Sequence, residues 1–228
     1  MISAIILAAG DSSRMGRTKA LLEYKGATFL GTALAGAKAA GAGETIVVLG
    51  ANRAEVLAAW RPKEEKIAFN GTPELGQIAS VRAGLKMAGP EAEAAMICLV
   101  DQPLIKPETY KLIAGFWRLH KDFLVIPRCR REAGQPWVTS HRSQVTGQNS
   151  DNSTLHPLPS TLFFKRGHPI IIPRRYFQLC FDGPAGKGLH WVTHHPSVTP
   201  ADLTVEDGGI IRDFDTPEEY SRLPAGDR

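Results

Sequence analysis

The opening stretch of the chain, residues 1–19, reads M-I-S-A-I-I-L-A-A-G-D-S-S-R-M-G-R-T-K. A short apolar run at residues 2–7 stops at two alanines and a glycine, and a polar loop follows that carries two arginines and a lysine. An apolar run of this length before a glycine loop predicts a buried strand of a parallel sheet. Open α/β sheets bind ligands at the carboxyl ends of their strands, where small residues and positive charge suit a phosphate group. The stretch therefore predicts a site for a nucleoside triphosphate.

Composition limits the classes to which the protein can belong. Its 228 residues, 43% of them hydrophobic, suffice for one core and favour a single globular domain. The formal charge is only +4 and no run of five like charges occurs, so we expect no nucleic-acid partner. Cys98, Cys129 and Cys180 lie far apart, which argues against a disulfide framework or a structural zinc site and favours the reducing cytoplasm. No apolar stretch approaches the ~20 residues of a membrane span, so we expect no membrane partner.

Strand and helix patterns alternate along the chain. Further buried strands are expected at residues 44–49 and 95–100. Two more strands are expected at 66–69 and 123–126, and helices near 29–41, 52–60, 78–87 and 107–120. This rhythm indicates βαβ units and a mostly parallel sheet covered by helices on both faces. Residues 129–165 fit no core element. Beyond them we expect strands at 169–172, 203–205 and 210–214, and helices near 174–180, 189–193 and after Thr216.

The first loop matches neither of the two common phosphate-binding motifs. Five residues separate Gly10 from Gly16 and Lys19 follows three later, which excludes both G-x-x-x-x-G-K-[ST] and G-x-G-x-x-G. Backbone N–H groups from Gly10 to Ser13, with the charges of Arg14 and Lys19, could still hold a triphosphate. The alternative is a plain turn with solvated charges.

Carboxylates follow two of the expected strands. Asp101 ends the most apolar strand, and a parallel sheet would bring it beside the first loop, where triphosphates carry Mg²⁺. Asp213 and Asp215 flank Phe214, so alternation along a strand would place both on one face and let either complete a metal site. The alternative for each is a capping role at the turn or helix that follows.

For two further motifs, residue types alone do not decide between a functional and a structural role. Gly76, Gln77 and Ser80 begin a helix and could hydrogen-bond a base or ribose, or simply form its N-terminus. His168, between Gly167 and Pro169, is more typical of a structural histidine, and the other histidines show no metal-ligand spacing.

In combination these motifs resemble a known family. The pattern L-A-A-G-x-S-x-R-M-G-x-x-K-x-L-L at residues 7–22 is similar to that of the MobA-like nucleotidyltransferases, specifically the molybdenum cofactor cytidylyltransferase group. The same order of motifs follows along nearly the whole chain: Gly76-Gln77-x-x-Ser80, Asp101-Gln102-Pro103, Gly167-His168-Pro169 and Asp213-x-Asp215-Thr216-Pro217-Glu218.

The resemblance implies a fold and a set of roles. The fold would be a single α/β domain, a Rossmann-like nucleotidyltransferase fold of the GT-A type over residues 1–228, with an atypical insert at about 129–165. Arg14, Lys19 and Asp101 would be catalytic, and Asp101 and Asp215 would hold Mg²⁺. The nucleotide would be bound by Leu7, Ala8, Ala9, Gly10, Ser12, Arg14, Lys19, Gly76, Gln77, Ser80 and Asp101. The phosphorylated acceptor would be bound by Gln102, Pro103, Gly167, His168 and Asp213.

The resemblance also implies a reaction. The enzyme would transfer CMP from CTP to the terminal phosphate of molybdopterin or the molybdenum cofactor, with pyrophosphate released and a molybdenum hydroxylase as receiver of the product. The choice of CTP over GTP rests on Ala8 and Ala9, because GTP users of the family tend to have glycine in this pair. A phosphate acceptor is already largely dianionic at neutral pH and needs no general base, which agrees with the absence of a Ser-His-Asp or Cys-His set.

Two other functions remain open at this point. One is nucleotidyl transfer to another phosphorylated small molecule, such as a sugar phosphate or methylerythritol phosphate. The other is a nucleotide-binding chaperone that carries the cofactor to a molybdenum hydroxylase. The long insert and the turn Asp182-Gly183-Pro184-Ala185-Gly186-Lys187-Gly188 depart from the family pattern and leave the acceptor in question.

Overall fold

The fold is built around strand β1 (Ile2–Ala8), whose seven residues are all buried. The computed structural model describes residues 1–10, 12–131 and 163–228. β1 pairs in parallel with β4 (Glu44–Leu49) on one side and with β6 (Ala94–Leu99) on the other. Strands that are covered on both faces need apolar side chains throughout, which explains the unbroken apolar runs in the sequence.

The main sheet has eight strands, and most neighbouring pairs in its core are parallel. Its order is β10-β7-β9-β6-β1-β4-β5, with β8 paired to β7. β9 runs antiparallel to both β6 and β7, and β8 runs antiparallel to β7. The remaining strands are β5 (Lys66–Phe69), β7 (Leu124–Arg131), β8 (Phe163–Arg166), β9 (Ile170–Pro173) and β10 (Pro200–Thr204), and β2 (Glu23–Tyr24) and β3 (Ala27–Thr28) form a separate hairpin. The α/β class and the mostly parallel sheet predicted from the sequence are confirmed.

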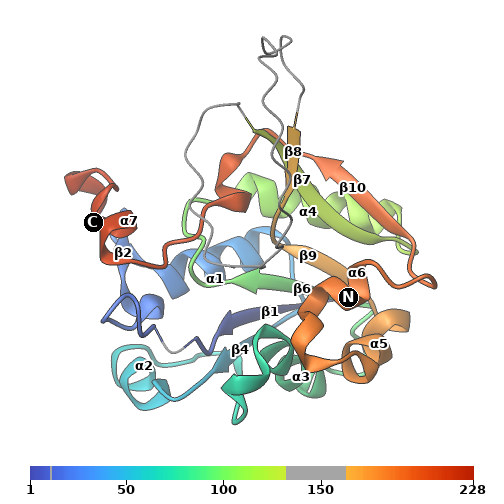
Figure 1. The fold of residues 1–228 in the computed structure, drawn as a ribbon, viewed down its shortest axis with the longest axis horizontal. Helices are drawn as coiled ribbons and strands as arrows, with labels where there is room; N and C mark the ends of the chain where they lie inside the picture. The colour runs from blue at the N-terminus through green and yellow to red at the C-terminus, as the bar shows by residue number, and fades with distance from the viewer. Residues whose placement is uncertain (11, 132–162) are drawn as a thin grey trace, which may run out of the picture.

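Helices cover both faces of the sheet (Figure 1). On one face α1 (Phe29–Ala39) and α4 (Pro107–Leu119) pack with Ile6 and Val47, and on the other α3 (Gln77–Met87) packs with Ile5 and Val48. Neighbouring residues of a strand point to opposite faces, so β1 contributes to both cores. The other helical elements are α2 (Arg53–Ala59), α5 (Phe177–Asp182), α6 (Gly188–Thr193) and α7 (Pro217–Ser221), with short 3₁₀ turns at Lys19–Leu21, Pro73–Leu75, Arg174–Tyr176, Ala185–Lys187, Gly208–Ile211 and Ala225–Asp227.

Two strand predictions are wrong in detail. Residues 210–214 form no strand, because a 3₁₀ turn occupies Gly208–Ile211 and an irregular segment follows. The strand expected at 203–205 is β10, which begins at Pro200 instead. Asn52 directly precedes α2, and its side chain makes no capping hydrogen bond among the described residues. The helix expected after Thr216 is α7, which Thr216 caps in a capping box with Glu219.

The expected insert lies mostly outside the described residues. Its first residues extend β7 to Arg131 and its last residues form β8, which had no strand signal of its own. Residues 132–162 are not described. In the part of the chain that is described, no helix is long and apolar enough to cross a membrane.

Candidate active site

The candidate site lies at the carboxyl ends of β1 and β6, where two loops leave the centre of the sheet. The loop after β1 leads to the 3₁₀ turn that starts at Lys19, and Asp101 lies in the turn just after β6. Ser12 has a positive φ of 55° and its Oγ accepts a hydrogen bond from the backbone N–H of Lys19 at 3.2 Å. The loop is therefore folded back on itself, which directs the Lys19 side chain toward the end of β6.

Four charged side chains from three separate segments meet at this point. Lys19 Nζ lies 3.2 Å from Asp101 Oδ2 and also donates a hydrogen bond to Asp215 Oδ1. Arg14 Nη2 lies 3.1 Å from the other oxygen of Asp215. The Asp215 side chain is 9% exposed and that of Lys19 15%, whereas Arg14 is 56% exposed. The structure thus brings together the predicted catalytic residues Arg14, Lys19 and Asp101, and it places Asp215 beside them.

The charged side chains at this site shift one another's pKa values. Burial alone lowers the pKa of Lys19, but attraction to Asp101 and Asp215 outweighs it and raises that pKa. Burial raises the pKa of Asp101, and repulsion from Asp213 and Asp215 acts in the same direction while Lys19 opposes it. A carboxylate with a raised pKa gains most from an added cation, so the site is predisposed to bind positive charge.

The C-terminal segment carries Asp215 to the site although it forms no strand. Phe214 is 2% exposed and packs against Phe29 of α1, and its backbone N–H donates to Asp101 O at 3.0 Å. The carboxylate of Glu219 accepts from the backbone N–H of Asp215 at 2.7 Å. Glu219 was missed as a site residue, yet its place in the pattern Thr216-x-x-Glu219 is that of a capping box.

The predicted nucleoside residues line the ends of β1 and the start of α3. Ala8 and Ala9 are 3% and 6% exposed, and Gly50 lets the end of β4 approach them, because a Cβ there would lie 2.4 Å from Ala9 O. Ser80 is buried and its Oγ accepts from Asn70 Nδ2 at 2.9 Å. Asn70, at the end of β5, is a second residue that the sequence did not single out.

The other predicted nucleotide residues lie around this centre. Leu7 is buried in β1 at 8% exposure and Gly10 is exposed at the start of the loop. Gly76 has a φ of 73°, which favours glycine, and Gln77 is the exposed first residue of α3. These positions border the end of the sheet at which Lys19 and Asp101 meet.

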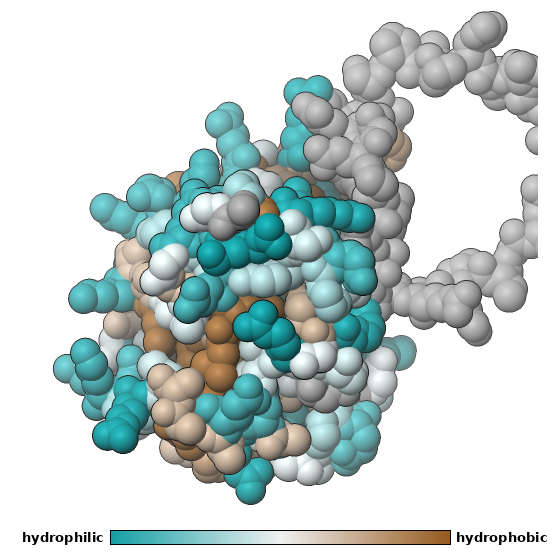
Figure 2. Space-filling model, turned by 90° about the vertical axis from the view of Figure 1, so that its left-hand side faces the viewer, coloured by the Kyte–Doolittle hydropathy of each residue, from teal (hydrophilic) through white to brown (hydrophobic). Residues whose placement is uncertain are grey.

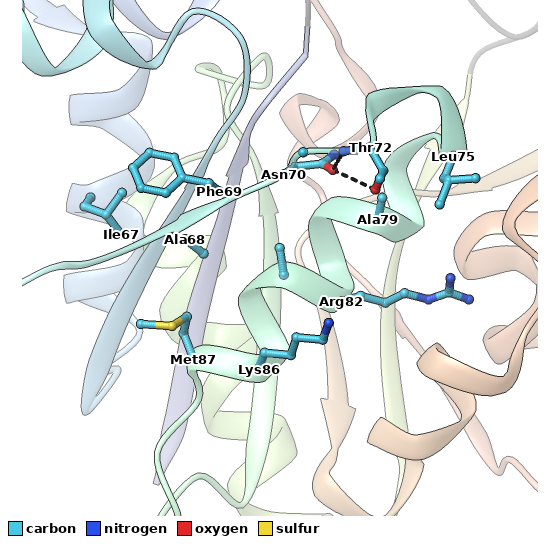
Figure 3. Close-up of a pocket in the computed structure, with 12 residues that line it drawn as sticks. Ile67, Ala68, Phe69, Asn70, Thr72, Leu75, Ala79, Arg82, Lys86 and Met87 are labelled. Atoms are coloured by element: carbon cyan, nitrogen blue, oxygen red, sulfur yellow. Dashed lines mark hydrogen bonds between the residues drawn. The ribbon is translucent and has the colours of Figure 1, made fainter.

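Two cavities lie beside the predicted nucleotide-binding residues. One of about 590 Å³ lies between β5 and α3 and is lined by Asn70, Thr72 and Arg82 among others (Figure 3). The second, of about 480 Å³, lies between the first loop and α2 and is lined by Ser12, Arg17, Asn52 and Glu55 among others. Figure 2 views the molecule from the left-hand side of Figure 1, where hydrophobic side chains are framed by hydrophilic ones.

The predicted acceptor residues form a group next to Asp101. Gln102 is 5% exposed and its Nε2 donates to Asp213 Oδ1 at 2.7 Å. Gly167 is buried, and Pro103 is buried directly after Gln102. Burial lowers the pKa of His168 to about 4, although the charge of Asp213 acts in the opposite direction. The imidazole is therefore neutral at physiological pH.

The donor set fits the predicted magnesium ion. Asp101 and Asp215 both bond the same nitrogen, Lys19 Nζ, so two carboxylates converge on one position that a small cation could take. Mg²⁺ is commonly held by one or two carboxylates, with substrate phosphates and water as its other ligands. Within residues 1–10, 12–131 and 163–228, no group of three His, Cys, Asp or Glu side chains is arranged to hold a metal. The two carboxylates would therefore need phosphate and water oxygens to complete the coordination.

Comparisons with known proteins agree with this architecture. The family model of the MobA-like NTP transferase domain matches residues 4–190. Nicotine blue oxidoreductase of Paenarthrobacter nicotinovorans is 28% identical over 226 residues, which cover 97% of this chain and 96% of that protein. A probable molybdenum cofactor guanylyltransferase of Bacillus velezensis is 28% identical over 71% of this chain and 78% of its own. The bifunctional protein GlmU of Xanthobacter autotrophicus is 36% identical over 114 residues, and the matched part of this chain spans only 25% of its length.

Solved structures show the same fold. Rv0371c of Mycobacterium tuberculosis superposes with a TM-score of 0.74 at 26% identity, over 97% of this chain and 96% of that one. A manganese complex of the same mycobacterial protein superposes with a TM-score of 0.70 at 24% identity, over 97% of each chain. A protein of this fold thus binds a divalent cation.

Proposed function

This chain belongs to the MobA-like NTP transferase family, and on that basis we propose that it transfers CMP from CTP to the terminal phosphate of molybdopterin or the molybdenum cofactor. One observation carries the proposal. Lys19, Asp101 and Asp215, which are distant in sequence, share one cluster of ion pairs at the carboxyl edge of the sheet. Such a cluster can bind a triphosphate and its cation, which is what nucleotidyl transfer requires.

The proposed reaction moves the α-phosphorus from one oxygen to another. An oxygen of the acceptor phosphate forms a bond to the α-phosphorus of CTP, and the bond from that phosphorus to the oxygen bridging to the β-phosphate breaks. Pyrophosphate leaves with that oxygen. Because the acceptor phosphate is already largely dianionic near neutral pH, the protein only has to position the groups and neutralise charge.

The charged side chains have separate roles in this proposal. Arg14 is exposed enough to reach the triphosphate while it still contacts Asp215 at 3.1 Å. Lys19, once released from the carboxylates, would donate to the phosphate oxygens and stabilise the negative charge on the departing pyrophosphate. Asp101 and Asp215 would hold Mg²⁺, which neutralises triphosphate charge when it is bound.

The choice of CTP rests on the end of β1. Ala8 and Ala9 are buried, and the Ala9 carbonyl is packed against the backbone of Gly50, so the space beside the base is fixed. A methyl group that narrows a rigid pocket discriminates against a larger base. The Bacillus velezensis relative carries the name of a guanylyltransferase, so GTP is the competing nucleotide.

Nicotine blue oxidoreductase of Paenarthrobacter nicotinovorans, which matches over nearly its full length, suggests oxidoreduction as a second candidate function. Against this candidate stands the first loop, in which the G-x-G-x-x-G pattern of dinucleotide-binding folds is absent. The cluster of Lys19, Asp101 and Asp215 supports transfer of a nucleotide instead.

A substrate panel tests the proposal. Pyrophosphate release is measured with CTP, GTP, ATP and UTP, each with and without molybdopterin and with a sugar phosphate or methylerythritol phosphate as alternative acceptors. We expect release that depends on both CTP and molybdopterin. Release that requires another phosphorylated acceptor would replace the proposed acceptor, and tight CTP binding without turnover would indicate a cofactor chaperone. Oxidation of NADH or NADPH without any pyrophosphate would favour the oxidoreductase.

A further inference from the structure

Helix α6, which contributes no residue to the candidate active site, carries a pair of exposed histidines. His190 and His194 are one helical turn apart, at the i, i+4 spacing that makes two side chains neighbours. The backbone N–H of His194 donates to His190 O at 3.2 Å, so the helical hydrogen bonds continue through both residues. Leu189 and Val192 of the same helix are buried, and α6 packs beside α5 (Figure 1). The two imidazoles are therefore open to solvent on a backbone that the core holds in place.

The rings of His190 and His194 already lie close together. Their centroids are 3.9 Å apart and their planes differ by only 13°. Imidazole nitrogens bind Zn²⁺ at about 2.0–2.1 Å, so two of them on one tetrahedral ion lie about 3.3 Å apart. Exposed side chains rotate rapidly about their own bonds. A small turn of each ring is therefore enough to bring one nitrogen of each to a shared metal ion.

Hydrogen bonds determine which ring nitrogen of His194 is free to bind a metal. His194 Nδ1 lies 3.0 Å from His190 O, which can only accept, so we assign the proton to Nδ1 and the lone pair to Nε2. The Thr193 hydroxyl donates to the same carbonyl at 3.2 Å and accepts from Nδ1 at 2.9 Å. Metal-binding histidines commonly donate their second ring nitrogen to a carbonyl in this way, which orients the ring. Neither ring nitrogen of His190 makes a hydrogen bond among the described residues.

His195, the next residue, is bonded in the opposite sense. The backbone N–H of Ser197 donates to His195 Nδ1 at 3.3 Å, and Ser197 Oγ lies 2.7 Å from the same nitrogen. The lone pair of His195 is thus on Nδ1, where these bonds already occupy it. From the sequence we expected no metal-ligand spacing among these histidines. The helix gives that spacing to His190 and His194 alone of the three, because its hydrogen bonds extend to His194.

We propose that His190 and His194 form a surface site for one divalent transition-metal ion of the Zn²⁺, Ni²⁺ and Cu²⁺ class, bound through one imidazole nitrogen of each. Imidazole suits these ions, whereas Mg²⁺ and Mn²⁺ prefer oxygen ligands. No third His, Cys, Asp or Glu side chain joins the pair within the described residues, so water completes the coordination. The site differs from the carboxylates of Asp101 and Asp215 in its ligands and in the metal that it selects, and it is independent of the proposed CMP transfer.

The test is isothermal titration of the full chain with NiCl₂ in a millimolar background of MgCl₂, which competes for Asp101 and Asp215. We expect a site that takes one Ni²⁺ per chain. His190→Ala and His194→Ala should each lower its affinity by ~10-fold or more, because two linked ligands bind far more tightly than one. His195→Ala changes a histidine of the same cluster and should leave the affinity unchanged.

Thermal unfolding supplies a second readout, since a ligand that binds only the folded chain raises the unfolding midpoint. NiCl₂ should raise the midpoint of the wild-type protein and of His195→Ala, but not that of His190→Ala or His194→Ala. Scans with a chelator present show whether each variant is folded without metal. Unchanged Ni²⁺ affinity in either His190→Ala or His194→Ala would overturn the inference. A single variant that keeps half the capacity at full affinity would show two independent imidazoles, and this too would overturn the shared site.

Discussion

At the scale of single residues, Lys19 cannot bind the carboxylates of Asp101 and Asp215 and a triphosphate with the same ammonium group at the same time. Its ammonium group bonds the carboxylates of Asp101 and Asp215, which are the same groups that would hold a metal ion. Attraction to them raises the pKa of Lys19 despite its burial, so it stays charged. A cation that enters the site must therefore compete with this side chain, and the lysine it releases becomes available for the triphosphate.

Replacement of Lys19 by methionine separates these two roles. Removal of the ammonium takes a shared counter-ion from two partly buried carboxylates, of which Asp215 keeps Arg14, so we expect the affinity for Mn²⁺ alone to rise several-fold. Turnover should fall by ~10²-fold, because a charge that stabilises the leaving group is lost. Isothermal titration with MnCl₂ measures the first effect and pyrophosphate release the second. Lys19→Arg keeps the charge and should not tighten Mn²⁺ binding; weaker Mn²⁺ binding by Lys19→Met would contradict this account.

The pair Ala8-Ala9 gives a second prediction at this scale. Ala9→Gly removes a buried methyl group beside the proposed base pocket, and one such group is worth about 1–3 kcal/mol of discrimination. We expect the ratio of kcat/KM for CTP to that for GTP to fall by roughly 10-fold or more. A ratio that stays constant while both values change would show that Ala9 supports the fold only.

At the scale of elements, two glycines in helices α1 and α4 differ in how much space an added Cβ would find. Gly36 of α1 faces α4, and a Cβ there would lie 2.5 Å from the ring of Tyr110. Gly115 of α4 has open space instead, with nothing within 4 Å of an added Cβ. The two positions form a matched pair, since both lie inside a helix.

Gly36→Ala should lower the free energy of unfolding by about 1–3 kcal/mol, because the crowding outweighs the better helix propensity of alanine. Gly115→Ala should raise it by up to about 1 kcal/mol through that propensity alone. Urea denaturation followed by circular dichroism measures both. Shifts of the same sign in the two variants would show that the α1–α4 contact is less tight than described.

Glu44 ties three elements together at the amino end of β4. Its carboxylate bonds Lys66 of β5 at 2.7 Å, the backbone N–H of Gly89 at 2.8 Å and the hydroxyl of Ser3 in β1. Burial alone would raise the pKa of Glu44, but these hydrogen bonds lower it below its ordinary value of 4.5. A carboxylate with a lowered folded-state pKa contributes stability that is present above pH 4.5 and is lost as the pH falls through the folded-state value.

Glu44→Gln should therefore lower the free energy of unfolding at pH 7 by about 1.5–3 kcal/mol, the usual range for hydrogen bonds to a charged group. The difference from the wild-type protein should shrink as the pH falls below 4.5. Denaturation at pH 7, 5 and 3 tests this, and Glu64→Gln, at an exposed position outside this network, serves as the control. A difference that is independent of pH would contradict the role assigned to the charge.

The elements also show what sequence patterns can and cannot predict. The apolar run within residues 44–49 predicted the observed bounds of β4, because a strand covered on both faces is apolar along most of its length. A strand was also predicted at residues 210–214, yet the backbone there follows contacts with distant residues, such as the bond from Phe214 N–H to Asp101 O. Such contacts over more than a hundred residues leave no local trace.

At the scale of the whole molecule, the site is assembled from loops that only the sheet brings together. The chain order of the motifs predicted which loops would meet, since the carboxyl ends of parallel strands share one edge. Arg14, Lys19 and Asp101 do meet there. The contact of Asn70 with Ser80 could not be predicted, because it depends on how the end of β5 packs against α3, whereas Glu219 has a local signal in the capping-box pattern Thr216-x-x-Glu219.

The central claim is that the carboxylate of Asp101 serves nucleotidyl transfer. The most direct test compares pyrophosphate release from CTP and molybdopterin by the wild-type protein and by Asp101→Asn, which keeps the shape and removes the charge. We predict that Asp101→Asn loses ~10²-fold or more in turnover and keeps its unfolding midpoint or gains stability, because a buried carboxylate with a raised pKa has been neutralised. Turnover within about 3-fold of the wild-type rate, less than 1 kcal/mol of transition-state stabilisation, would contradict the account.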